Sequence, residues 1–196
     1  MGNGGRADED QGDAVKVGRT LYAKNRKEWR SWLAKNHKSA AEIWLIYYNK
    51  DSGKPRIPYN DAVDEALCYG WIDSLLKPID AHKYAQRYSP RKKTSRLSDM
   101  NRERVRRLVK SGRMTKAGLA AIEHTGKGSS KLPDDIVARL KQDAVTWRHF
   151  QKFPASYKRI RVGWIAAARH RREVFEQRLR YFLKMTKQNK RFGMVQ

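Results

Sequence analysis

Apolar residues in the first half of the chain change their spacing from one segment to the next. Within residues 26–36, Trp29, Trp32 and Leu33 recur at helical spacing, which predicts an amphipathic helix. Residues 42–49 are dense in β-branched and aromatic side chains, as is typical of a strand. The change from one pattern to the other indicates a fold that combines helices with a sheet.

A second helix and two short strands are expected next. Apolar residues of 59–69 share one helical face. Gly70 suits the end of that helix, because glycine readily adopts the left-handed backbone often found there. Short strands are predicted at 71–73 and 82–88, joined through Pro78.

From Ser98 onward the pattern is helical. Ser98 and Thr115 are each placed to cap a helix, because a side-chain hydroxyl can accept a hydrogen bond from a free amide of the first turn. Further helices are expected after Asp134 and near Ser156, and a last one at about 173–188. The apolar stripe of this last helix consists of Phe175, Leu179, Phe182 and Leu183.

These elements predict an α+β protein with a small antiparallel sheet, helices packed on it and a helical C-terminal region. Residues 1–18 are rich in glycine and acidic side chains and are expected to form a disordered tail. The α+β core with its packed helices would occupy residues 19–125. A linker at 126–132 would join it to the helical region at 133–196.

Composition and charge narrow the class of protein. The chain has 196 residues, 39% of them hydrophobic, and a formal net charge of +24. That charge predicts salt-sensitive attraction to polyanions such as nucleic acid, acidic lipid or acidic protein. The sequence has no apolar stretch near the ~20 residues needed to cross a bilayer, and no signal-peptide core. The single cysteine, Cys68, suits a reducing compartment, so a cytoplasmic location is expected.

The segment around residue 71 suggests a small polar pocket. Asp73 directly follows two apolar residues, and a buried carboxylate needs a cation or a hydrogen bond. Arg87 or Arg91 is the expected cation. The simpler interpretation is a structural ion pair or a turn cap. The side chains expected to line the pocket are Glu65, Trp71, Asp73, Tyr84 and Arg87.

Two basic stretches are suited to bind a polyanion. The first, residues 87–96 with the helix that follows, combines cations, hydroxyls and a nearby ring, which suit phosphate contacts and stacking. The second, 158–191, ends in a basic amphipathic helix, so binding to a membrane surface is an alternative. A solvated face that maintains solubility is the simpler interpretation of both. The cations expected to take part are Arg87, Arg91, Lys92, Lys93, Arg96, Arg102, Arg106, Lys110 and Arg113.

Catalytic and metal-binding patterns are weak. The five histidines are not spaced as metal ligands, and no cofactor is expected. Cys68 lies near a helix C-terminus, where the helix dipole disfavours a thiolate, so it is interpreted as a packing residue. Glu65 and Asp73 could act as an acid and a base, which leaves an enzyme of unknown reaction as an alternative.

Residues 65–74, Glu-Ala-Leu-Cys-Tyr-Gly-Trp-Ile-Asp-Ser, resemble the signature of the YdeI/OmpD-associated family, also called bacteriocin-protection proteins. The resemblance extends over roughly residues 20–185. It implies a small bacterial α+β protein linked to envelope stress and to tolerance of antimicrobial peptides, without an established reaction. Further pieces match in the same order along the chain. Two lie upstream, at 29–33 and 43–48, and the others lie downstream, at 84–91, 98 with 101, 112–115 and 164–165.

Together, the resemblance and the charge predict a non-enzymatic stress-tolerance protein that acts through an anionic partner, either an acidic protein or a nucleic acid. The first alternative is a non-specific nucleic-acid-binding protein without a role at the envelope. The second alternative is an enzyme built on the region between Glu65 and Asp73.

Overall fold

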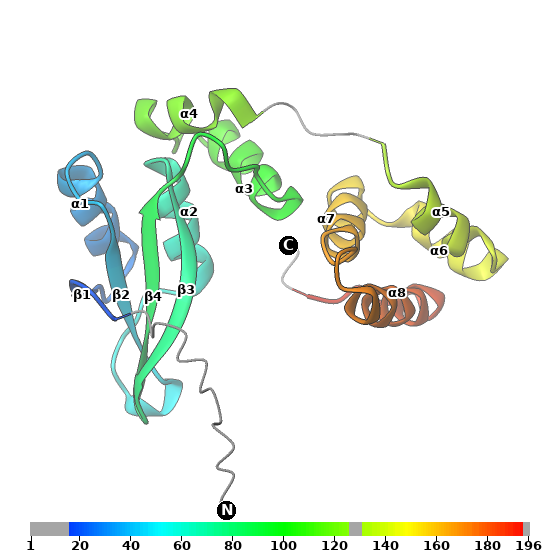
Figure 1. Ribbon diagram of the computed structural model, residues 1–196, viewed down its shortest axis with the longest axis horizontal. Coiled ribbons are helices and arrows are strands. Elements are labelled where there is room, and N and C mark those ends of the chain that lie inside the picture. The colour runs from blue at the N-terminus through cyan, green and yellow to red at the C-terminus, as the bar shows by residue number, and fades with distance from the viewer. Residues whose placement is uncertain (1–15, 126–130, 194–196) are drawn as a thin grey trace, which may run out of the picture. The chain divides into compact units, whose positions relative to one another are not determined.

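The structure is a computed structural model that describes residues 16–125 and 131–193 (Figure 1). Most of the predicted tail and linker lies outside these residues. A four-stranded sheet and eight α-helices occupy the described chain, which confirms the predicted α+β class. The chain falls into two units: Met1–Ala66 with Trp71–Pro90, and Leu67–Gly70 with Arg91–Gln196.

The sheet belongs to the first unit and has the strand order β1-β2-β4-β3. Strand β2 (Ile43–Tyr48) pairs antiparallel with β4 (Lys83–Pro90), which pairs antiparallel with β3 (Trp71–Asp80). Strand β1 (Thr20–Tyr22) adds a parallel edge that the sequence did not predict. A strand of three residues is too short to show a periodic pattern.

Strands β3 and β4 form a longer hairpin than predicted. Pro78 lies within β3, opposite Tyr84, and not in the connection between the strands. Proline lacks a backbone N–H, and an edge strand such as β3 can accommodate it because one side of that strand needs no ladder partner. The pairing register shifts between Asp73 and Leu76 and again near Pro78, which interrupts the ladder.

Helix α1 (Arg26–Asn36) packs its predicted apolar face into the core of the first unit. Trp29 is fully buried, and its ring lies 5.3 Å from that of Tyr88 in β4. The Trp29 indole N–H also donates to the carbonyl of Ala62, 3.0 Å away in α2 (Tyr59–Cys68). This hydrogen bond satisfies the one polar atom of a large buried ring.

The second unit is helical. Ser98 and Thr115 cap α3 (Asp99–Lys110) and α4 (Lys116–Ile122) as predicted, and each accepts a hydrogen bond of 3.2 Å from the backbone amide three residues later. The described helices of this unit are α3 (Asp99–Lys110), α4 (Lys116–Ile122), α5 (Asp134–Lys141), α6 (Ala144–Lys152), α7 (Ala155–Ala166) and α8 (Arg172–Lys187).

The predicted stripe of the last helix, α8, packs into the core. Leu179 and Phe182 are buried, and Phe175 and Leu183 pack against the same cluster. Binding to a membrane surface would require this apolar face to be exposed to lipid, but the face is packed in the protein core. Within the described chain, no helix combines the length and the apolar character needed to cross a membrane.

Candidate anion-binding surface

The predicted ion pair of Asp73 with Arg87 or Arg91 is wrong, because Asp73 forms no ion pair with either residue. Asp73 accepts a hydrogen bond of 2.7 Å from the hydroxyl of Tyr59, and Arg87 Nε donates to Glu42 at 2.6 Å. Tyr88 stands opposite Asp73 across the hairpin, so the adjacent Arg87 faces the other side of the sheet. The hydrogen bond from Arg87 lowers the pKa of the Glu42 carboxyl below its usual range.

Glu65 serves a structural ion pair. Its carboxylate is fully buried and lies 2.6 Å from Arg30 and 3.5 Å from Arg26, both on α1. These charge-assisted contacts compensate for the loss of hydration and hold α1 against α2. A carboxylate closed off in this way is unsuited to exchange protons with a substrate, which counts against the enzyme alternative.

Trp71 and Tyr84 also act in packing. Trp71 is buried as predicted, its indole N–H donates to the carbonyl of His37 at 3.1 Å, and its ring meets Trp32 edge-on. Tyr84 stacks on Tyr47 with ring centroids 5.2 Å apart. The contacts just described join each of these five residues to a residue outside the predicted pocket, and the pocket itself stays a prediction.

A group of tyrosines near Asp73 was missed by the sequence analysis. The hydroxyls of Tyr47 and Tyr88 lie 3.1 Å apart in the core, and Tyr59 donates to Asp73. Burial raises the pKa of both Tyr47 and Tyr88, and the negative charge of Asp73 adds to this effect. These phenols therefore stay protonated and act as structural hydrogen-bonding groups.

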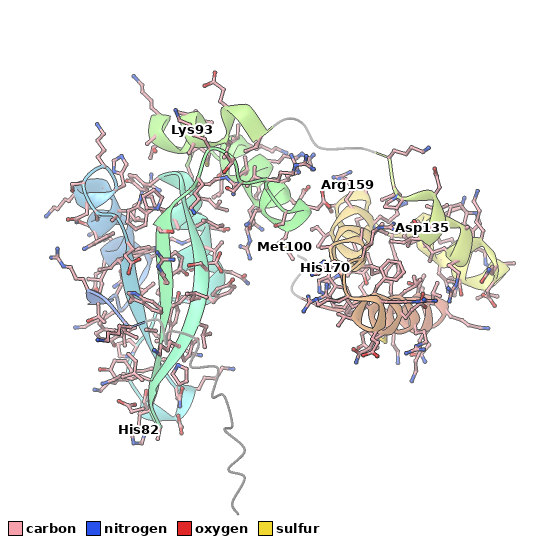
Figure 2. The ribbon with its side chains drawn as sticks, in the orientation of Figure 1. His82, Lys93, Met100, Asp135, Arg159 and His170 are labelled. Atoms are coloured by element: carbon pink, nitrogen blue, oxygen red, sulfur yellow. The ribbon has the colours of Figure 1, made fainter. Side chains whose placement is uncertain are left out.

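The first basic stretch includes a fixed loop, residues 91–96, here called the basic loop (Figure 2). Arg91 Nη2 donates to the carbonyl of Ser95 at 2.6 Å, and the amide of Ser95 donates to the carbonyl of Lys92 at 3.0 Å. Burial lowers the pKa of Arg91, and the nearby charge of Arg102 adds to this. Arg91 thus shapes the loop, while Lys92, Lys93 and Arg96 are exposed.

The predicted continuous basic face of α3 is interrupted. Arg102 has a side chain only 15% exposed, lies 4.0 Å from Asp99 and donates to the carbonyl of Thr125. Arg113 is half-buried, whereas Arg106 and Lys110 are exposed. Arg102 therefore has a structural role, and the exposed cations lie further along the helix.

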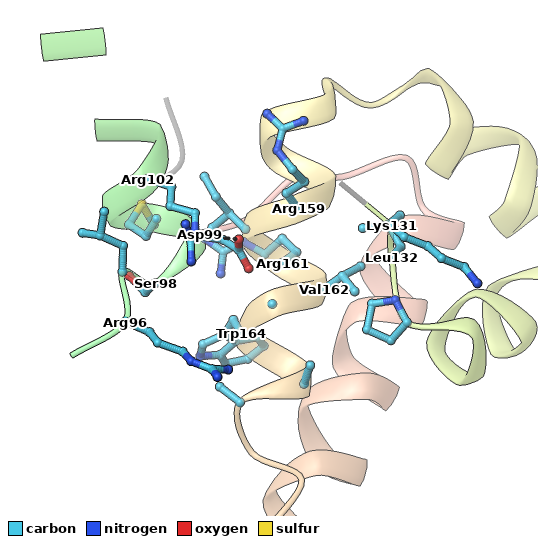
Figure 3. A pocket seen from close by; sticks show the side chains of 17 residues that line it. Arg96, Ser98, Asp99, Arg102, Lys131, Leu132, Arg159, Arg161, Val162 and Trp164 are labelled. Atoms are coloured by element: carbon cyan, nitrogen blue, oxygen red, sulfur yellow. Dashed lines mark ion pairs between the residues drawn. The ribbon is translucent and has the colours of Figure 1, made fainter. Parts of the chain in front are cut away.

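A cavity in the second unit was also missed. Its volume is about 720 Å³, and it lies between residues 96–102, residues 131–133 and α7 (Figure 3). Arg159 and Arg161 contribute to its lining from a helix that otherwise buries apolar residues. The sequence signal for this cavity was the pair of arginines on a largely apolar helix. In a chain with a net charge of +24, two further arginines did not stand out.

The part of the chain that the structure describes contains no cluster of metal ligands, and its cysteine is not exposed. Those residues contain no group of three or more histidine, cysteine or acidic side chains able to hold a metal ion. Cys68 is fully buried, in keeping with its interpretation as a packing residue.

The structure thus defines an α+β protein with a basic helical unit. Residues 21–121 match the model of a family described as a domain of unknown function, DUF8412, and the chain belongs to this family because the match spans more than half of it. Residues 129–189 match the model described as bacteriocin-protection, YdeI or OmpD-associated, which confirms the resemblance drawn from the sequence. No curated protein and no solved structure matches the chain.

The two matches fall on different parts of the chain. The YdeI or OmpD-associated match covers helices α5 to α8, whereas the signature at 65–74 falls within the other match. The matches are separated by residues 122–128, which overlap the linker predicted at 126–132. The division into a core at 19–125 and a helical region at 133–196 stays a prediction. In the structure, residues 91–125 group with the second unit.

Proposed function

We propose that this chain is a non-enzymatic, cytoplasmic stress-tolerance protein of the bacteriocin-protection type that binds an anionic partner through its basic loop. The supporting observation is the state of Lys92 and Lys93. Both side chains are exposed, and neither forms an ion pair or hydrogen bond with any described residue. Cations in this state are available to a partner.

The loop is also preorganised. The contacts from Arg91 to Ser95 and from Ser95 to Lys92 fix its backbone before a partner arrives. A fixed loop loses less conformational entropy on binding than a flexible one. Each phosphate or carboxylate that Lys92 or Lys93 neutralises releases counterions, so binding weakens as salt rises.

A pair of charge-reversal variants tests this proposal. Lys92→Glu with Lys93→Glu alters the loop, and Lys24→Glu with Lys27→Glu makes the same change in net charge at exposed sites of the first unit. Binding of the full chain to a duplex DNA and to poly-glutamate is measured at several salt concentrations. The loop variant is expected to bind about tenfold more weakly than the control variant. An equal loss of affinity in the two variants would show that binding depends on the overall charge of the protein and not on the basic loop.

The same measurement distinguishes the nucleic-acid alternative. Thr94 is exposed between Lys93 and Arg96, and a hydroxyl among cations suits contacts to phosphate oxygens. Tighter binding to several unrelated DNA duplexes than to poly-glutamate would favour a non-specific nucleic-acid-binding protein. Preference for poly-glutamate would favour an acidic protein partner.

A further inference from the structure

The cavity of the second unit has mainly apolar walls. Leu132 and Val162 lie on its inner surface, and Trp164 contributes an aromatic ring (Figure 3). Its volume of about 720 Å³ falls within the range of roughly 300–1,000 Å³ typical of small-ligand sites. Such walls suit an apolar chain or ring better than a fully hydrated ion.

Arg161 brings an unusual charge to this cavity. The residue is only 7% exposed, and its Nε has no hydrogen-bond partner. Among the described residues, no carboxylate lies within salt-bridge distance of its guanidinium. Its neighbours are the rings of Phe192 and Trp164, 4.8 Å and 5.8 Å from the guanidinium carbon. Cation–π contacts offset only part of the cost of burying a charge.

The remaining cations of the cavity differ in their pairing. Arg102, Arg159 and Lys131 lie within 4.0 Å of Asp99, Glu103 and Asp134, respectively. Arg96 is exposed, and its side chain has no ion pair or hydrogen bond with a described residue. Among the described residues that line the cavity, Asp99 is the sole acidic one. The cavity lining therefore carries an excess of positive charge, and two of its guanidinium groups form no ion pair with any residue that the structure describes.

From this arrangement we infer that the cavity binds an amphiphilic anion, meaning a carboxylate or phosphate group attached to an apolar chain. The anionic group is held by Arg161 and Arg96, since a guanidinium presents paired donors that match either group. The apolar chain lies against Leu132 and Val162. Arg96 belongs to the basic loop and also lines the cavity, whereas Lys92 and Lys93, on which the proposed polyanion contact rests, do not line it.

Isothermal titration calorimetry with simple probes tests the inference. Decyl phosphate and decanoate, below their micellar concentrations and at physiological salt, are expected to bind the full chain with one site each. Comparison of the two probes identifies the preferred anionic group. Inorganic phosphate lacks the chain and is expected to bind at least about tenfold more weakly. Decyltrimethylammonium, with the opposite charge, is expected not to bind at this site.

Two variants and a matched control locate the site. Arg161→Gln is expected to weaken decyl phosphate binding by about tenfold or more, and Arg148→Gln, an exposed change of equal charge on α6, by less than about twofold. If Arg161→Gln does not fold, Ala167→Trp fills the cavity from an exposed position without changing charge, and it should also weaken binding about tenfold.

Three results would overturn the inference. The first is equal binding of decyl phosphate and decyltrimethylammonium, which would indicate association through the chain alone. The second is equal binding of inorganic phosphate and decyl phosphate. The third is unchanged binding by Ala167→Trp, which would place the ligand outside the cavity. Lys92→Glu with Lys93→Glu should leave decyl phosphate binding intact, so this result is independent of the proposed polyanion contact.

Discussion

The carbonyl oxygen of Cys68 accepts two hydrogen bonds from Thr115, one from its backbone amide at 3.1 Å and one from its hydroxyl at 2.6 Å. The same hydroxyl accepts a hydrogen bond of 3.2 Å from the amide of Gly118. Thr115 therefore satisfies the terminal carbonyl of α2 and a free amide of α4 together.

Replacement of Thr115 by valine should destabilise the protein. Valine keeps the shape of threonine but cannot donate to Cys68 or accept from Gly118, so we expect a loss of about 1–3 kcal/mol in the free energy of unfolding. Urea denaturation measures this loss. Thr94→Val, an exposed change in the basic loop, should cost less than about 0.5 kcal/mol. Similar effects of the two variants would show that the Thr115 hydroxyl contributes little.

Gly118→Ala should also destabilise the protein, although alanine favours a helix by about 1 kcal/mol. A Cβ at Gly118 would overlap the backbone carbonyl of Cys68, which cannot move as a flexible side chain can. We expect a net loss of about 1–3 kcal/mol by denaturation. Ala120→Gly, at an exposed position of the same helix, reports the propensity effect alone. If Gly118→Ala were more stable than the parent protein, the close approach between Gly118 and the carbonyl of Cys68 would be contradicted.

Asp143 should make stability depend on pH. Its carboxylate accepts a hydrogen bond of 2.7 Å from the amide of Thr146 and one of 2.9 Å from Lys187, and both lower its pKa. The unfolded chain takes up this proton near pH 3.9, so the stabilisation is complete above that value and is lost as the pH falls toward the folded pKa.

Asp143→Asn keeps a capping oxygen but removes the charge. The difference in Tm between the parent and this variant should therefore be largest near pH 6 and should shrink toward about pH 2. Thermal unfolding followed by circular dichroism measures it. A difference that stayed constant over this range would show that the charge of Asp143 does not contribute.

Trp71→Ala should remove a large part of the stability of the protein. The ring is 1% exposed and contacts Trp32, and its N–H is hydrogen-bonded to His37. Truncation of such a ring in a core costs roughly 3–5 kcal/mol, which denaturation would measure. Trp71→Phe should lose less, because it retains an aromatic ring. A cost below about 1 kcal/mol for Trp71→Ala would mean that the ring is not part of the core.

A double-mutant cycle between Tyr59 and Asp73 should show coupling. Tyr59→Phe and Asp73→Ala each remove the 2.7 Å hydrogen bond, so we expect a coupling free energy of about 0.5–1.5 kcal/mol. The corresponding cycle between Arg87 and Asp73 should give a value near zero, because Arg87 pairs with Glu42. Coupling in the second cycle and none in the first would restore the ion pair predicted from the sequence.

Local patterns in the sequence were sufficient to predict most of the helices. The helix predicted at 26–36 has those bounds, and Ser98 and Thr115 cap the helices that follow them. Helical periodicity and capping depend on residues within a few positions of one another, so the relevant information lies in a short stretch of chain. The net charge and the α+β class follow from composition and pattern in the same way.

The partners of the charged residues were decided only by the tertiary structure. Asp73 and Arg87 lie on opposite faces because of the hairpin register, and Arg102 donates to the carbonyl of Thr125, 23 residues away in the sequence. Arg161 is buried beside Phe192, which is distant in the sequence. Pairing of this kind depends on which surfaces meet when the chain folds. A sequence with 44 lysines and arginines offers too many equivalent candidates for spacing alone to select among them.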